Sequence, residues 1–214
     1  MRSRWIFRLL VFVGAFALVH RLIVRMGRGW GADQDEVVEP LPGDELVPIT
    51  DGQATMAISI DAPPEDVWPW LVQMGVDRGG LYSLLWVENG LLRLGVKNAD
   101  RIVPEWQDLK VGDMIAFTPE GYPSGRYGPT VTAIEPNRAL VMAHGTDPGA
   151  AVGSWQFVLE PEDDGTTRLL MRSRSSANKP SGLKLFDALA EPGYLIMDIA
   201  MLRGIKERAE GRAA

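Results

Sequence analysis

The sequence predicts an α+β fold in which a curved antiparallel β-sheet wraps around a long C-terminal helix. Short segments of alternating apolar and polar residues follow one another between short turns, the pattern of antiparallel strands with one face on a core. The last segment carries apolar residues at helical spacing. A chain of 214 residues with 46% hydrophobic residues is long enough for one such domain and an appendage.

The first strand and the first helix of this domain follow each other directly. Met56, Ile58 and Ile60 alternate with small or polar residues and predict a strand with one buried face. Pro63 or Pro64 suits the first helical position, where the missing N–H costs nothing, and acidic residues follow where the helix dipole favours them. The order predicted here is therefore strand, then helix.

Five more strands are expected after one or two short helices between Leu81 and Leu94. Turn residues at Glu135–Arg138 and Asp163–Gly165 separate some of them. Their regular spacing and short turns indicate a strongly curved antiparallel sheet. The predicted strands are Met114–Thr118, Thr130–Glu135, Ala139–His144, Ser154–Glu160 and Thr167–Ser173.

The C-terminal segment, Leu183–Arg208, is predicted to form a short helix and then a long one that begins at Pro192. One face of the long helix is apolar and should close over the concave sheet. Asp198 lies within one position of this apolar stripe, and a capped or exposed Asp is favoured over one that points into a cavity. The stripe consists of Leu195, Ile199, Leu202 and Ile205.

Several motifs of the chain carry a family resemblance. They are Ser59–Gly75, Arg78–Ser83, Trp86–Asn89, Asn98–Ile102 and Pro104–Asp113. Together they resemble a membrane-anchored bacterial subgroup of the START-related SRPBCC superfamily, which includes sequences labelled polyketide cyclase/dehydrase. The resemblance extends from Trp30 to Glu210. It implies a helix-grip fold with a hydrophobic cavity under the long helix, in a superfamily that contains both binding proteins and enzymes.

The N-terminal segment predicts a membrane anchor. Leu9–Val19 contains no polar side chain, and Trp5–Val24 is long enough to span a bilayer if Arg8 and Arg21 reach opposite headgroup layers. We therefore expect a single-pass transmembrane helix in the cell membrane. A cleaved signal peptide and a peripheral amphipathic helix are the alternatives. Arginines flank both ends of the segment, so they do not decide which side of the membrane the domain occupies.

Charge and composition exclude several classes of function. The formal net charge is −6, and the basic residues before Asp33 leave a strongly acidic body, which argues against nucleic-acid binding. The chain has no cysteine and only one histidine outside the N-terminal segment, so neither a metal site nor a disulfide is expected. The glycine spacing matches no nucleotide-binding motif, and no cofactor is expected.

The chain divides into three predicted parts. Residues 1–30 form the membrane anchor with basic flanks, and residues 53–210 form the helix-grip domain. Residues 31–52 carry prolines and many acidic side chains with little periodicity, so they predict an extended linker.

Candidate binding residues come from the aromatic and charged side chains of the domain. A mostly apolar pocket with a few polar groups is the usual form of a small-molecule site. The expected ligand-binding residues are Tyr82, Trp86, Trp106, Trp155, Arg101 and Arg172, with plain core packing or a solvated surface as the alternative for each. No residue is assigned a catalytic role. If the protein is an enzyme, His144, Glu88 and Asp100 are the groups that could transfer protons.

The function predicted from the sequence is membrane-tethered binding of a hydrophobic small molecule such as a lipid, an isoprenoid or a polyketide-like compound. A cyclase- or dehydratase-like enzyme that uses the same cavity is one alternative. A protein-interaction module that uses the outside of the domain is another. An apolar cavity would support the first two, and a large exposed apolar patch the third.

Overall fold

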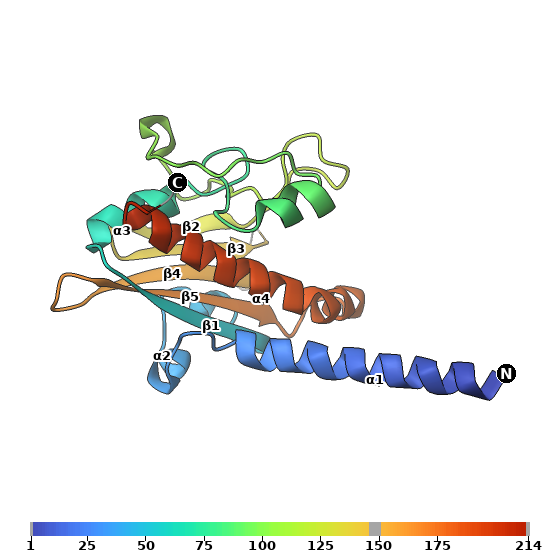
Figure 1. Ribbon diagram of the computed structural model, residues 1–214. Helices are drawn as coiled ribbons and strands as arrows, with labels where there is room; N and C mark the ends of the chain where they lie inside the picture. The colour runs from blue at the N-terminus through green and yellow to red at the C-terminus, as the bar shows by residue number, and fades with distance from the viewer. Residues whose placement is uncertain (1, 146–150, 213–214) are drawn as a thin grey trace.

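A computed structural model describes residues 2–145 and 151–212, with side chains for Trp5, Arg8 and the residues from Val11 onward. Five antiparallel strands form one sheet in the order β1-β5-β4-β3-β2, and the C-terminal helix α4 crosses one face (Figure 1). This is a helix-grip arrangement. The helices are α1 (Arg2–Gly27), α2 (Gln34–Val38), α3 (Pro64–Val72) and α4 (Ser181–Ala209), and the strands are β1 (Thr50–Ile60), β2 (Thr130–Glu135), β3 (Ala139–His144), β4 (Gly153–Pro161) and β5 (Thr167–Ser176). Short helical turns are η1 (Asp44–Leu46), η2 (Trp86–Leu91) and η3 (Pro104–Trp106).

The predicted antiparallel sheet is confirmed, with one strand fewer than expected. The residues of Met114–Thr118 make only isolated bridges, from Met114 to Thr130 and from Thr118 to Tyr127. Between these two bridges, the backbone N–H of Ile115 donates to the carbonyl of Pro129, at 3.0 Å. Proline has no N–H with which to return the second bond of such a pair, so the ladder is interrupted at this position.

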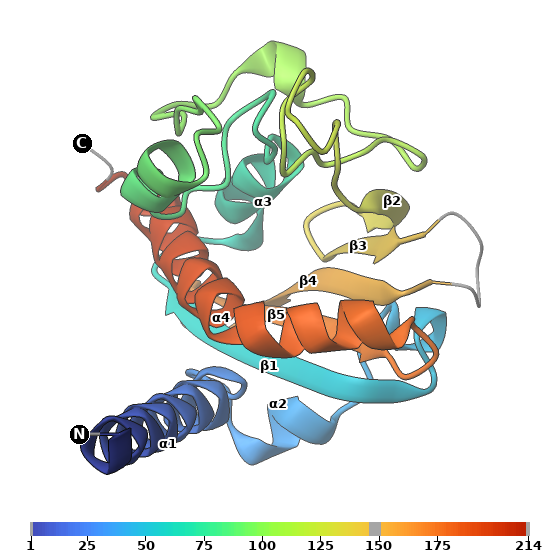
Figure 2. The same cartoon turned by 90° about the vertical axis from the view of Figure 1, so that its right-hand side faces the viewer.

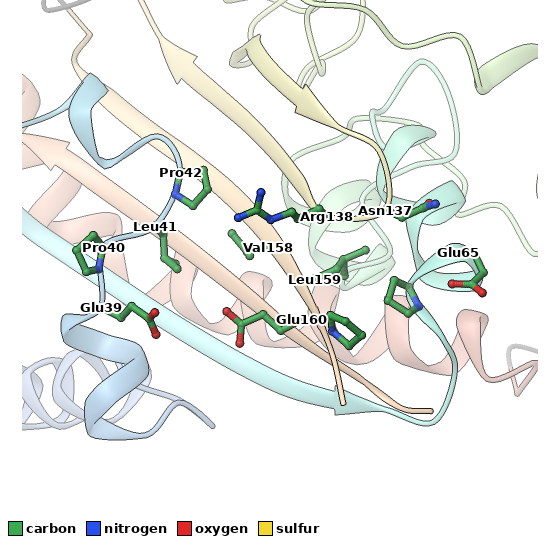
Figure 3. Close-up of a pocket in the computed structure, with 12 residues that line it drawn as sticks. Glu39, Pro40, Leu41, Pro42, Glu65, Asn137, Arg138, Val158, Leu159 and Glu160 are labelled. Carbon is green, nitrogen blue, oxygen red and sulfur yellow. The ribbon is translucent and has the colours of Figure 1, made fainter. Parts of the chain in front are cut away.

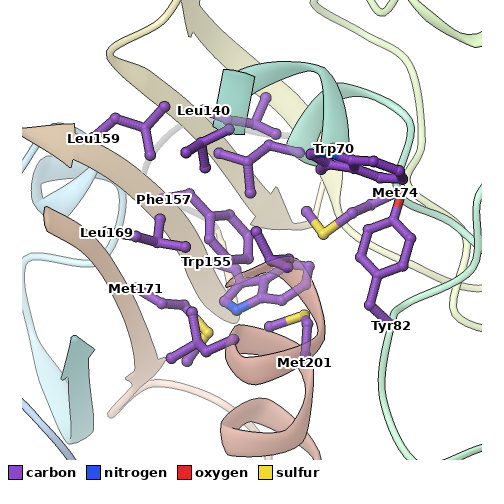
Figure 4. Close-up of a cluster of buried hydrophobic side chains, with 14 of the residues drawn as sticks. Trp70, Met74, Tyr82, Leu140, Trp155, Phe157, Leu159, Leu169, Met171 and Met201 are labelled. Atoms are coloured by element: carbon purple, nitrogen blue, oxygen red, sulfur yellow. The ribbon is translucent and has the colours of Figure 1, made fainter. Parts of the chain in front are cut away.

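The inner face of the sheet and α4 enclose the main core. Trp155, Phe157 and Leu159 alternate along β4 and point to this face, as strand geometry requires. Figure 4 shows them packed against Met171 of β5 and Met201 of α4. The helix therefore lies where the sequence predicts, over the concave side of the sheet.

Helix α4 is continuous, which corrects the prediction of a break at Pro192. Pro192 lies inside the helix and cannot donate a hydrogen bond to the carbonyl of Ala188. The Nε2–H of His20 in α1 donates to that carbonyl instead, at 2.8 Å. A side chain from a distant helix thus occupies the acceptor that the proline leaves open.

Helix α1 covers the predicted anchor segment and packs on α4 with its C-terminal part. The guanidinium of Arg28 pairs with Glu191 at 2.5 Å, and Gly27 lies against Leu195 so closely that a Cβ there would come within about 3.0 Å of it. Beyond α1, the carbonyl of Arg28 accepts the N–H of Thr55 on the edge strand β1. Within the described residues, no helix combines the length and the apolar character that a membrane crossing requires.

Residues 50–52 begin β1, and the segment before them packs on the outer face of the sheet, so residues 31–52 do not form the extended linker that the sequence predicts. Figure 2 shows α2 on the outer side of β1, opposite α4. Leu41 and Val47 of this segment are buried against the outer face. The acidic residues, which suggested a solvated tether, meet basic residues of β5: Asp44 pairs with Arg172 at 2.7 Å and with Arg174 at 3.3 Å.

Candidate functional site

The space between α4 and the sheet has two halves that differ in packing. Under the C-terminal half of α4, the inner-face residues are completely buried, as Leu202, Ile205 and Phe157 show with 0% exposure each. Under the N-terminal half, side chains on the same faces keep contact with solvent, including His144 at the end of β3 and Ser173 on β5. We call this second region the partly exposed half, and it is the candidate site.

Asp198 lies on the face of α4 that is turned toward the sheet. Leu195, Leu202 and Ile205 stand three, four and seven positions from it, and all three are buried in the core. Residues at this spacing share one face of a helix. Asp198 therefore lies on the same face as this buried stripe and is itself partly buried, although the sequence favours a capped or exposed Asp there.

Burial raises the pKa of Asp198 from 3.8 to about 7. No nearby charge contributes to this shift, which comes from desolvation. A carboxyl group in this state changes protonation near neutral pH and can both donate and accept a hydrogen bond.

His144 and Tyr127 form a polar pair beside an aromatic cluster. The Tyr127 hydroxyl lies 3.0 Å from His144 Nδ1, and the two rings stack at 5.4 Å between centroids. Phe117 connects this pair to Trp155, with ring centroids 5.9 Å from His144 and 5.3 Å from Trp155. Burial lowers the pKa of His144 to about 4, so its imidazole is neutral at neutral pH and carries one donor and one acceptor nitrogen.

Helix α4 adds further polar groups at its N-terminal end. Asp187 pairs with the buried Lys179 at 2.5 Å, and its charge acts on both His144 and Tyr127. Tyr194 lies one turn before Asp198 on the same side, and burial raises its pKa. The partly exposed half therefore combines apolar aromatic walls with hydroxyl, imidazole and carboxyl groups.

Two of the sequence-predicted residues, Trp155 and His144, meet in this region. Tyr82 lies instead in the filled half, where it packs edge-on against Trp70 and under the Arg208 guanidinium. Burial raises the pKa of Tyr82 to about 12.

The remaining predicted residues lie elsewhere. Trp86 is 71% exposed, and Asp100 and Arg101 are exposed on a loop. Trp106 is half-buried, and its carbonyl accepts a hydrogen bond from Arg78 at 2.7 Å. Glu88 is fully buried in η2 with both carboxylate oxygens lacking a partner among the described residues, and burial raises its pKa.

Arg172 is buried on the outer face, where it holds residues 36–44. Its guanidinium donates to Asp44, to the hydroxyl of Thr55 and to the carbonyls of Glu36, Val37 and Glu39. A buried arginine requires such a set of acceptors. The carboxylate that pairs with Arg172 belongs to Asp44 of the protein itself, and the arginine lies on the face of the sheet opposite the candidate site.

A hollow of about 660 Å³ also lies on the outer face, between residues 39–42 and the β2–β3 turn. Figure 3 shows Glu39 and Glu160 side by side at one end of it. Burial and the neighbouring Glu39 and Glu36 raise the pKa of Glu160. The sequence predicts a cavity on the opposite side of the sheet, and nothing in the sequence indicates this hollow.

Several groups of the candidate site carry no signal in the sequence. Tyr127 stands in a glycine-rich loop, Asp187 stands near the start of α4 and Tyr194 near its middle, and no local pattern marks any of them. Among the described residues, no three or more His, Asp or Glu side chains are grouped so that they could hold a metal ion.

No protein-family model and no curated protein matches this chain. Solved structures similar to it include the Aha1 dimer from Colwellia psychrerythraea, which is 17% identical over 76% of this chain and 99% of that chain, with a TM-score of 0.42. The polyketide-cyclase-like protein Cgl2372 from Corynebacterium glutamicum is 20% identical over 72% of this chain and 88% of that chain, with a TM-score of 0.40. Protein NE0264 from Nitrosomonas europaea is 13% identical over 72% of this chain and 94% of that chain, with a TM-score of 0.41.

Proposed function

We propose that this protein binds an apolar small molecule with a hydrogen-bonding end, such as a lipid, an isoprenoid or a polyketide-like compound, in the partly exposed half between α4 and the sheet. The position of Asp198 carries this proposal: its carboxyl group faces the sheet, and its pKa is raised to about 7 by burial. The Asp198 side chain keeps some contact with solvent, so a ligand can reach it, and a hydrogen bond from the ligand would satisfy its carboxyl group.

The surroundings of Asp198 suit a ligand of mixed character. Trp155 and Phe117 offer aromatic surface for an apolar body. Tyr127 and the neutral His144 offer hydrogen bonds for a hydroxyl, carbonyl or carboxyl group. Apolar walls with a few convergent polar groups are the usual form of a small-molecule site.

Titration with cis-parinaric acid, a fluorescent polyene fatty acid, tests this proposal. Ionised Asp198 would repel the carboxylate of the probe, so affinity should fall roughly tenfold between about pH 6 and pH 8. In Asp198→Asn the affinity should fall less with pH, and only the ionisation of the probe's own carboxyl group should still affect it. Asp66→Asn, an exposed Asp on α3, is the matched control and should behave as wild type. Absence of saturable binding, or an unchanged pH dependence in Asp198→Asn, would refute the proposal.

A cyclase- or dehydratase-like activity in the same place is the second candidate. The pKa of about 7 favours it, because a general acid or base works best when its pKa is close to the working pH. An enzyme of this kind would lose turnover of a polyketide-like substrate in Asp198→Asn while still binding it. Loss of binding without any measurable turnover in wild type would leave ligand binding as the function.

A further inference from the structure

The part of α1 that precedes His20 and the first turns of α4 expose a large apolar surface. On α1, Phe12 is 70% exposed, Phe16 57% and Val19 54%. On α4, Leu185 is 64% exposed, Phe186 59% and Leu189 61%. Contiguous apolar patches of this kind are rare on proteins that contact only water.

These two exposed sets form one surface because the helices lie side by side. His20 of α1 contacts Ala188 of α4, and Gly27 contacts Leu195, so the two helices run in the same direction. Leu185 and Leu189 stand within three positions of Ala188 and border this contact. In Figure 1, α1 continues beyond the sheet, and its N-terminal end projects past the beginning of α4.

The charges around this surface indicate what covers it. Arg8, Arg21 and Arg25 are exposed on α1, and no acidic side chain precedes Asp33. Between Arg8 and Arg21, α1 measures about 20 Å at 1.5 Å per residue, shorter than a hydrocarbon core of about 30 Å. Residues 9–19 have no polar side chain, so no face of that part of α1 suits water.

We propose that α1 and the first turns of α4 together dock onto the surface of an anionic lipid bilayer. The apolar side chains enter the boundary between headgroups and acyl chains, while the arginines pair with lipid phosphates. This inference does not depend on the proposed ligand site, because it involves the outer sides of the two helices.

Flotation of the full chain with lipid vesicles tests the docking surface. The chain should float with vesicles of phosphatidylcholine mixed with phosphatidylglycerol, and much less with phosphatidylcholine alone or at high salt. The double variant Leu185→Ser, Phe186→Ser should lower the partition coefficient at least tenfold without changing the thermal melt. Val38→Ser with Val111→Ser removes two equally exposed apolar side chains elsewhere and should bind as wild type.

Three results would overturn the proposal. In the first, the chain fails to float with the vesicles. In the second, the α4 double variant binds vesicles as wild type does, which would show that α1 alone contacts the membrane. The same variant could instead abolish concentration-dependent dimers in sedimentation, which would make a second copy of the chain the occupant.

A labelling experiment separates surface docking from membrane crossing. The chain has no cysteine, so Ser3→Cys and Gly29→Cys place single thiols at the two ends of α1. When the protein is added to intact vesicles, an impermeant maleimide should label both positions from outside. Protection of Ser3→Cys alone would show that α1 crosses the bilayer and would contradict the surface arrangement.

Discussion

Replacement of Asp198 by Asn should stabilise the protein at high pH and have little effect at low pH. In the folded protein the pKa is raised from 3.8 to about 7, so between these values the folded state holds a proton that the unfolded state has lost. The free energy of unfolding therefore falls as pH rises from about 4 to about 7 and is constant above that window. Asn resembles the protonated form and removes this loss.

The magnitude follows from the width of the window. Each pH unit corresponds to about 1.4 kcal/mol, so the full shift is worth about 4 kcal/mol. About 3 kcal/mol of this falls between pH 5 and pH 8. Urea unfolding of wild type and Asp198→Asn at these two pH values measures it, because other groups that titrate in the same range contribute equally to both proteins and cancel in the difference.

One outcome of these urea unfolding measurements would refute the raised pKa of Asp198. If Asp198→Asn changes the free energy of unfolding by the same amount at both pH values, Asp198 does not titrate near neutral pH. Its inward position would then be wrong, and the ligand site with it.

Three further changes probe the rest of the structure. Arg172→Ala should lower the free energy of unfolding by about 3 kcal/mol, because it leaves buried acceptors of residues 36–44 without a donor; a loss below about 1 kcal/mol in chemical unfolding would show that this segment does not depend on the arginine. His144→Gln should reduce the loss of stability on acidification. Burial lowers the pKa of His144 from 6.5 to about 4, so as pH falls through this range the unfolded state gains a proton before the folded state does, and the folded state loses about 3 kcal/mol of stability. Equal acid sensitivity of wild type and variant in a pH series of melts would contradict this. His20→Ala should cost about 0.5–1 kcal/mol by removing the donor to the Ala188 carbonyl, and an unchanged melting temperature would show that water replaces it.

The strands were predictable because their signals are local. The alternation in Thr130–Glu135 and Ala139–His144, with the turn between them, gives β2 and β3 with the predicted bounds. The turn itself is fixed by Asn137, whose φ of 60° is one that few residues other than Asn and Gly adopt readily.

The differences come from contacts between residues far apart in the chain. A proline in a helical pattern predicts a break, and only the position of His20 shows why α4 continues through Pro192. The acidic segment appears solvated until Arg172 and Arg174 are seen beneath Asp44. Neither contact leaves a local pattern in the sequence.

The candidate site was only partly predictable, because some of its residues have a local signal in the sequence and others do not. His144 and Trp155 are distinctive residue types on strands, so the sequence selects them. The sequence places Asp198 within one position of the apolar stripe. Successive residues of a helix are about 100° apart around its axis, so one position decides whether a side chain points inward or sideways. The buried set in α4 includes Leu195, Met201, Leu202 and Ile205, which centres the stripe nearer to Asp198 than the sequence suggests.

Native mass spectrometry of the full chain, with extraction and identification of whatever copurifies, tests ligand binding most directly. We expect an apolar molecule with a hydrogen-bonding end, bound one per chain and at lower occupancy in Asp198→Asn than in Asp66→Asn. An empty protein that also binds none of a panel of lipids, isoprenoids and polyketides would contradict it.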